Sequence, residues 1–176
     1  MFGNLKADFK RYIHLGDKWN IYLLFDQGLW AVVFYRFGRW ARNCPIPILS
    51  HILRLIAFIF FKLSEVIAGI SLPASAQIGK GFYVGHFGYI ILHSDVKMGE
   101  HCSVGPGVVI GTRGAGAQGA PVLGNNVYIG VGAKVLGNIK IGNDVKIGAN
   151  SVVLHDVPDG ATVVGVPAKI VDKQNS

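Results

Sequence analysis

The stretch "LGNNVYIGVGAKVLGNIKIGNDVKIGANSVVLHDVP", residues 123–158, places an aliphatic residue at every sixth position. Glycine usually follows this residue, and a second small or aliphatic residue stands four positions after it. A period of six fits neither an α-helix nor an alternating strand, and it is typical of a parallel β-helix. The residues that open the six hexads are Leu123, Ile129, Val135, Ile141, Ile147 and Val153.

The same repeat extends toward the N-terminus through "IGKGFY", "LHSDVK", "MGEHCS" and "VGPGVV". Three hexads close one triangular coil, and stacked coils pair their strands in parallel and bury one another's aliphatic residues. Glycine suits the corners, where the backbone turns tightly or takes a positive φ. We expect about four and a half coils between Leu72 and Pro158. A βα fold with glycine-rich loops is the alternative, but residues 72–158 show no 3.6-residue period.

The composition changes near "GISLP", residues 69–73. Fourteen of the nineteen aromatic residues precede residue 72, whereas a narrow β-helix filled with aliphatic side chains has little room for them. We therefore expect three parts. These are an α-helical N-terminal region over 1–70, a β-helix domain over 71–171, and a C-terminal tail over 172–176.

The N-terminal region contains two long apolar segments, residues 20–43 and 51–69, separated by the proline-containing "CPIPILS". Both are predicted to be helices. On the second, His51, Arg54, Lys62 and Glu65 fall within about 80°, and the remaining surface is almost wholly apolar. Such a helix either packs against protein, for example between subunits, or lies in a membrane interface. A spanning helix would need roughly 20 apolar residues, and charges and prolines interrupt this segment.

The net charge of +7 is concentrated in residues 1–71, which hold nine Lys and Arg against four Asp and Glu. This favours anionic partners. Nucleic acid is not expected, because the basic residues lie among apolar ones rather than in a stripe. Cys44 and Cys102 form no disulfide framework, and the N-terminus shows no secretory signal. We expect a cytoplasmic protein, with peripheral contact at the inner face of the membrane through residues 19–70.

The six-residue repeat is interrupted twice, and functional residues are expected at these interruptions. "VGHFGYII", residues 84–91, has two residues too many, and "TRGAGAQGAPV", residues 112–122, is a longer insertion. His86 lies in the first. An exposed imidazole at a corner suits a general base that removes a proton from a hydroxyl group, although a plain surface histidine would look the same in the sequence.

Other chemistries receive less support from the sequence. His93 and His101 follow His86 at spacings of seven and eight, so a zinc site of three histidines is an alternative, but no short ligand spacing repeats. We therefore expect no metal. Cys102 stands at a hexad position that elsewhere carries Val or Ala, which favours a core residue over a nucleophile. No GxSxG or GK[ST] motif occurs.

The elements "GHFG", "GVVIG", "VLGNIKIG" and "GVPAKIV" resemble those of the left-handed β-helix acyltransferases with hexapeptide repeats. The resemblance covers residues 70–171 and is closest to the serine acetyltransferase branch and its exopolysaccharide and colanic-acid-type O-acetyltransferase relatives. It implies a left-handed β-helix, a homotrimer with active sites between adjacent β-helices, acetyl-CoA as co-substrate, and His86 as the catalytic base. It also implies CoA contacts at Gly111, Thr112, Gly130, Val131, Lys146, Gly165, Pro167 and Ala168.

The chain departs from this family at positions that matter for the acceptor. Serine acetyltransferases carry an Asp where this chain has Gly85, and a His where it has Ala120, and an Arg near that His has no counterpart in "AQGAP". Such groups would hold a zwitterionic amino acid. The acid that orients the base is replaced by Ser71, and Asp95 is a possible substitute for it.

From these departures we expect the acceptor to be a sugar hydroxyl of a surface polysaccharide or its precursor, which could be lipid-linked. Serine O-acetylation is the alternative enzymatic reading. An inactive β-helix that serves as a scaffold is a third.

Overall fold

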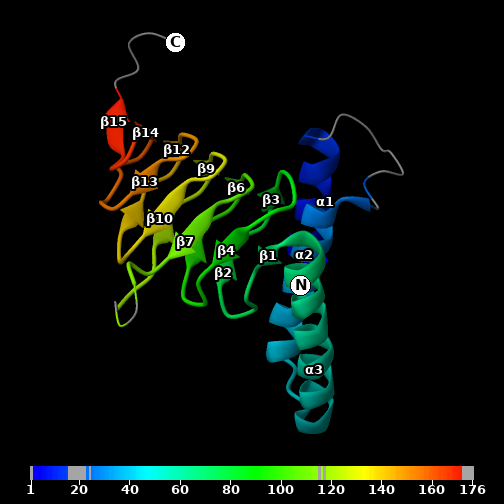
Figure 1. Cartoon of the computed structure of the whole chain (residues 1–176). Coiled ribbons are helices and arrows are strands. Elements are labelled where there is room, and N and C mark those ends of the chain that lie inside the picture. Colours follow the sequence, from blue (N-terminus) through cyan, green and yellow to red (C-terminus); the bar gives the residue numbers. More distant parts are fainter. Residues whose placement is uncertain (1, 16–22, 24, 115, 117, 172–176) are drawn as a thin grey trace.

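The computed structural model describes residues 2–15, 23, 25–114, 116 and 118–171. It shows a parallel β-helix with the N-terminal helices packed over one end (Figure 1). The predicted tail, residues 172–176, lies outside the described residues. The β-helix architecture predicted from the six-residue period is therefore confirmed.

Three sheets form the walls of the β-helix, and we call them walls A, B and C. Wall A consists of β1 (Ile70–Ser71), β4 (Ile90–Leu92), β7 (Val109–Gly111), β10 (Lys134–Leu136) and β13 (Val152–Val153). Wall B consists of β2 (Gln77–Ile78), β5 (Lys97–Met98), β8 (Val122–Leu123) and β11 (Lys140–Ile141). Wall C consists of β3 (Tyr83–Val84), β6 (Ser103–Val104), β9 (Tyr128–Ile129), β12 (Lys146–Ile147), β14 (Thr162–Val164) and β15 (Lys169–Val171), the last of which pairs antiparallel with β14.

Strand register gives the length of each coil. Along wall C, Tyr83 pairs with Ser103, Ser103 with Tyr128, Tyr128 with Lys146, and Lys146 with Thr162. Successive coils therefore hold 20, 25, 18 and 16 residues. A regular coil has eighteen, so both predicted insertions are confirmed, the first adding two residues and the second seven. The shorter last coil was not predicted.

The last coil is two residues shorter than a regular coil. The difference lies between walls A and B, where Val157 bridges Ile141. The sequence pattern suggested that Val157 follows Val153 within one hexad. The structure instead gives Val157 the role of a hexad-opening residue in wall B. The sequence pattern does not distinguish these two positions for Val157, because both require a buried aliphatic side chain.

The N-terminal helices are α1 (Phe2–Leu15), α2 (Gln27–Arg42), α3 (Pro47–Leu63) and a single π-helical turn, η2 (Ser64–Ala68). Asp26 caps α2 by accepting a hydrogen bond from the Leu29 N–H, and Pro47 occupies the first turn of α3. Both expected helices are confirmed within the described residues, whereas α1 was not singled out. Residues 19–22 and 24 lie outside the described residues.

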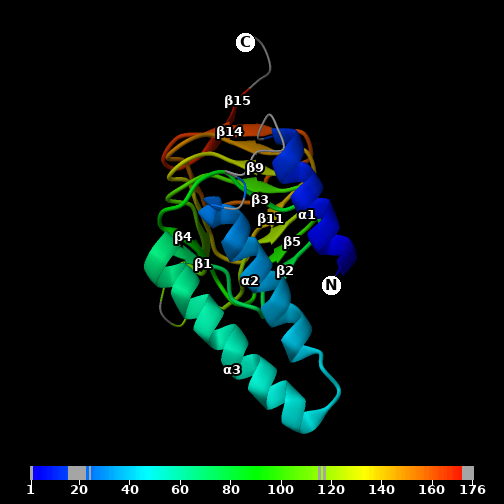
Figure 2. The ribbon, with the colours of Figure 1, turned by 90° about the vertical axis from the view of Figure 1, so that its right-hand side faces the viewer.

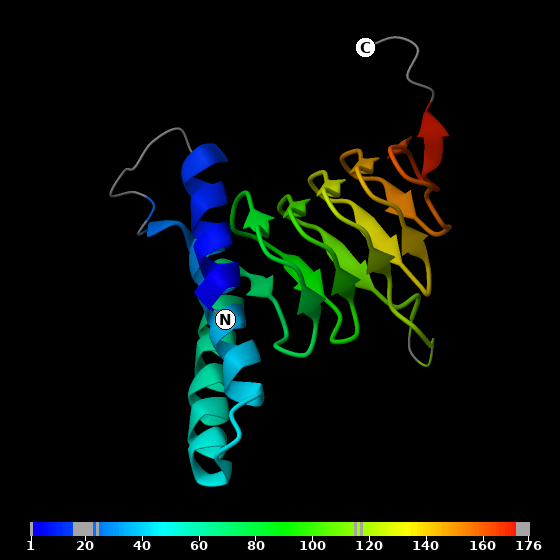
Figure 3. The ribbon, with the colours of Figure 1, turned by 180° about the vertical axis from the view of Figure 1, so that it is seen from behind.

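The helices lie across the N-terminal end of the β-helix, and the paired α2 and α3 extend beyond its edge (Figure 2). The opposite end carries β14 and β15 (Figure 3). No helix among the described residues is long and apolar enough to cross a membrane.

Two tyrosines cap the backbone of the first coil, which has no preceding coil to pair with. The Tyr35 hydroxyl accepts from the Ile78 N–H at 3.0 Å and donates to the Ala76 carbonyl at 2.8 Å. The Tyr12 hydroxyl likewise bonds both the N–H and the carbonyl of Val84. These bonds replace a missing strand, because an unpaired backbone group in a buried position is costly.

A buried ion pair completes this cap. Arg36 and Asp8 are 4% and 0% exposed, and Arg36 Nε lies 2.8 Å from Asp8 Oδ2. Arg36 also donates to the carbonyls of Ile78 and Gly79, while Asp8 accepts from the Phe82 N–H at 2.9 Å. Nearly every polar atom of the pair thus bonds to its partner or to the first coil.

Replacing Asp8 by Ala should destabilise the protein by about 3–5 kcal/mol, because it leaves the Arg36 guanidinium buried without a counter-charge. Urea unfolding followed by circular dichroism would measure this loss. Asp95→Ala, which removes an exposed carboxylate, is the matched control and should change stability by less than about 0.5 kcal/mol. Equal losses in the two variants would contradict a capping role for Asp8.

Candidate active site

The two-residue insertion forms a bulge, residues 85–89, at the corner between walls C and A. The Gly88 N–H donates to the Ala68 carbonyl at 2.8 Å, and its carbonyl accepts from the Gly107 N–H at 2.9 Å. The bulge is therefore anchored both to the end of η2 and to the next coil. Gly88 and Tyr89 have positive φ values of 111° and 49°, the first of which requires a residue without a side chain.

His86 lies in this bulge with its side chain exposed. Within the described part of the chain its imidazole has no hydrogen-bond or ion-pair partner. Both ring nitrogens are thus available to a bound molecule, as a general base requires.

Most of the predicted CoA residues share this corner with His86. We call it the C–A corner, formed by residues 85–89, 105–108, 130–133, 148–151 and 165–168. Backbone hydrogen bonds run along it, from Gly132 to Pro106 and from Asn150 to Val131. The predicted residues that lie here are Gly130, Val131, Gly165, Pro167 and Ala168.

The corner is exposed in part: Val131, Gly165 and Pro167 are exposed, whereas Gly130 is buried and its N–H donates to the Ile147 carbonyl at 2.8 Å. Val131 is 51% exposed, and Gly165 and Ala168 bond to the backbone of Val152 at 3.0 and 2.8 Å, which fixes the last segment against wall A. Lys146 is exposed on β12 of wall C, two residues before the corner segment 148–151. The resemblance implies that it contacts a CoA phosphate.

Gly111 and Thr112 lie elsewhere, at the corner between walls A and B. Gly111 ends β7, and a Cβ added there would meet the Cβ of His93 at 3.4 Å. The long insertion begins at the same corner, and its residues 115 and 117 lie outside the described residues. Within one chain, therefore, these two residues are not brought to His86.

The three histidines considered for zinc lie at three different corners of one coil. His86 precedes β4 of wall A, His93 follows β4, and His101 follows β5 of wall B. Side chains at separate corners cannot bind one ion. Among the described residues, no group of three or more His, Cys, Asp or Glu side chains could hold a metal.

Cys102 faces the core of wall C and is fully buried. Its sulfur lies 3.3 Å from the Gly124 carbonyl, and burial raises the pKa of the thiol to about 11. The thiolate needed for nucleophilic attack is therefore suppressed at neutral pH. This agrees with the prediction of a core residue.

The structure gives Ser71 a carboxylate partner that the sequence did not reveal. Its hydroxyl donates to Glu65 Oε1 at 2.8 Å, and Lys62 donates to Glu65 Oε2 at 2.7 Å. Burial opposes ionisation of Glu65, but these hydrogen bonds outweigh it and hold the pKa of Glu65 below its ordinary value. Glu65 belongs to η2, whose last carbonyl binds the bulge. Asp95, by contrast, lies beyond β4 next to His93.

Comparisons with known proteins identify the family to which the chain belongs. Residues 120–155 match the family model "Bacterial transferase hexapeptide (six repeats)". Serine acetyltransferase of Synechococcus elongatus is 37% identical over 85% of the chain and 59% of its own length. That of Helicobacter pylori strain J99 is 36% identical over 89% of the chain and 88% of its own length. The chain belongs to the serine acetyltransferase family.

Solved structures of the family share the whole fold. Serine acetyltransferase of Brucella abortus in complex with coenzyme A has a TM-score of 0.84 at 26% identity and covers 99% of the chain. That of Neisseria gonorrhoeae in complex with serine has a TM-score of 0.81 at 29% identity and covers 97%. The chain spans 68% and 69% of these proteins. The likeness includes the N-terminal helices and confirms a left-handed β-helix.

Membership of this family confirms the predicted enzyme class, an acetyl-CoA-dependent acyltransferase. The prediction of a sugar acceptor in polysaccharide biosynthesis is wrong, because relatives matched over most of the chain are named serine acetyltransferase. That prediction rested on charged groups missing at Gly85 and Ala120. The absence of these charged groups removes contacts to an amino acid, but it does not identify a different acceptor.

Proposed function

We propose that this protein transfers the acetyl group of acetyl-CoA to the hydroxyl of L-serine. The observation that carries the proposal is the match to serine acetyltransferases along nearly the whole chain, helices included. The C–A corner supports it, since the His86 imidazole, which has no hydrogen-bond partner among the described residues, lies on the same corner as the exposed Val131 and Gly165.

His86 would accept the proton of the serine hydroxyl while the oxygen attacks the thioester carbonyl. Backbone N–H groups would stabilise the developing oxyanion, an effect typically worth a few kcal/mol. As the C–S bond breaks, the proton passes from His86 to the departing CoA sulfur, leaving O-acetylserine and CoA. No covalent enzyme intermediate is needed. Gly130, Val131, Gly165, Pro167 and Ala168 would contact the CoA arm, and Lys146 a CoA phosphate.

We also propose that the active site is completed in a homotrimer. Gly111, Thr112 and the long insertion lie at a different corner from His86, so only a second copy can bring this corner to the first. Light scattering on the full chain should give the mass of three chains, and a monomeric yet active protein would contradict the proposal.

Replacing His86 by Ala should lower turnover with L-serine by about a hundredfold or more, the usual contribution of a general base. Release of the CoA thiol measures the rate. His155→Ala, which removes another exposed histidine, is the matched control and should retain full activity. CoA release that does not depend on serine, or a loss below about tenfold in His86→Ala, would contradict the mechanism.

Replacing Gly85 by Asp should lower the KM for L-serine. Gly85 does not have a positive φ, and an added Cβ would meet only Tyr83 Cε1 at 3.4 Å and the Val104 carbonyl at 4.0 Å. The new carboxylate would attract the serine ammonium group, which at an accessible position should lower KM by up to about fivefold. Gly85→Asn has the same shape without the charge and should not lower it. An equal effect of both variants would contradict this reading.

A further inference from the structure

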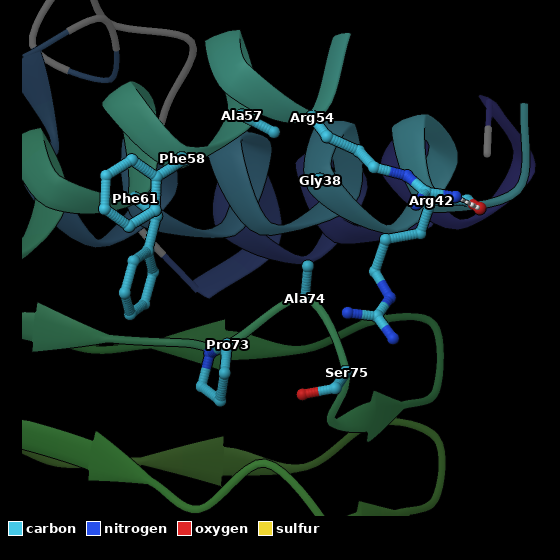
Figure 4. Close-up of a pocket in the computed structure, with 9 residues that line it drawn as sticks. All are labelled: Gly38, Arg42, Arg54, Ala57, Phe58, Phe61, Pro73, Ala74 and Ser75. Atoms are coloured by element: carbon cyan, nitrogen blue, oxygen red, sulfur yellow. Dashed lines mark hydrogen bonds between the residues drawn. The ribbon is translucent and has the colours of Figure 1, made fainter. Parts of the chain in front are cut away.

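A cavity of about 380 Å³ lies between α2, α3 and residues 73–75, which follow β1. Figure 4 shows Arg42 and Arg54 at one end of it and Phe58 and Phe61 at the other. Among the described residues that line it, none is a predicted catalytic or CoA-binding residue. Its volume falls within the range of small-molecule sites, so it is a candidate site separate from the C–A corner.

Small residues from all three segments leave the space between the two ends. Gly38 of α2, Ala57 of α3 and Ala74 line the middle of the cavity (Figure 4). A Cβ added to Gly38 would meet the Cβ of Ala74 at 3.0 Å and that of Ala57 at 3.8 Å. The cavity therefore exists because these positions carry little or no side chain.

The cationic end has no acidic partner among the described residues. Arg54 Nη2 donates to the Arg42 carbonyl at 3.2 Å, whereas the Arg42 guanidinium has no hydrogen-bond or ion-pair partner in the described part of the chain. No Asp or Glu occurs from Gln27 to Ser64, and the carboxylate of Glu65 already accepts two side-chain hydrogen bonds. Two guanidinium groups without a counter-charge attract an anion, and their N–H groups match the oxygens of a phosphate.

The other end of the cavity is aromatic. Phe58 is 55% exposed, so its ring is accessible from solvent. The Lys62 ammonium lies 5.8 and 5.4 Å from the ring centroids of Phe58 and Phe61, and it is neutralised by Glu65 at 2.7 Å. This end therefore offers ring surface rather than free charge, and ring surface favours an aromatic or other apolar group.

We propose that this cavity binds a small phosphate monoester with a compact aromatic or other apolar body. The phosphate would lie between Arg42 and Arg54, with the Ser75 hydroxyl on the cavity wall as a further donor, and the apolar body would contact Phe58 and Phe61. A phosphate monoester carries nearly two negative charges at neutral pH, which matches two guanidinium groups better than the single charge of a carboxylate. This inference does not depend on which acceptor the enzyme uses.

Isothermal titration of the full chain with phenyl phosphate, in the presence of saturating CoA, tests the proposal. The added CoA occupies its own site, so phenyl phosphate cannot bind there in its place. We expect one phenyl phosphate per chain, with a Kd of about 1 mM or tighter. Inorganic phosphate and benzyl alcohol each match one end of the cavity only, and each should bind at least about tenfold more weakly.

Two variants separate the two ends. Arg42→Gln with Arg54→Gln should weaken phenyl phosphate binding by at least about tenfold. Lys97→Gln with Lys140→Gln removes equal charge from exposed positions on wall B and should change the affinity by less than about twofold. Phe58→Ala should weaken binding of phenyl phosphate and leave that of inorganic phosphate unchanged.

Three results would overturn the proposal. The first is a wild-type protein that shows no saturable binding of phenyl phosphate. The second is an equal loss of affinity in the arginine and lysine pairs, which would show a general effect of charge. The third is a changed molar mass of the arginine variant in light scattering, because the arginines would then contact another copy of the chain.

Discussion

The first coil of the β-helix can form only because side chains of α1 and α2 take the place of a preceding coil. Tyr12 and Tyr35 each bond a backbone N–H and a backbone carbonyl of that coil, and the Arg36–Asp8 pair bonds three more backbone groups. In stacked repeats each unit depends on its neighbours, so an uncapped end weakens everything above it. The bulge that carries His86 belongs to this first coil.

The same end of the molecule therefore combines the cap and the chemistry. The Ala68 carbonyl at the end of η2 anchors the bulge, and Gly69 provides the left-handed turn, at φ 64°, by which the chain enters β1. π-helical turns are uncommon and occur frequently at functional sites. Here the turn also carries Glu65, whose carboxylate is held ionised beside Ser71. The helices thus do more than close the β-helix, because they position the corner on which acetyl transfer is proposed to occur.

The sequence predicted the β-helix and both insertions because a six-residue period makes every departure countable. It placed His86 and five CoA residues at positions that the structure brings to one corner. It did not reveal the capping contacts, in which Asp8 and Arg36 bond to residues more than forty positions away. The spacing of residues within a helix does not show which distant segment the helix packs against. The short last coil was hidden because Val157 fits either of two buried positions. The acceptor was misjudged because absent charges at Gly85 and Ala120 exclude contacts without identifying a substrate.

The central claim is that the bulge at the C–A corner is the place where serine is acetylated. A crystal structure of the full chain with CoA and L-serine tests it most directly. The account predicts the serine hydroxyl within roughly 2.6–3.2 Å of a His86 ring nitrogen, with CoA along Gly130, Val131 and Ala168. Serine or CoA bound at another corner, with His86 facing solvent, would contradict it.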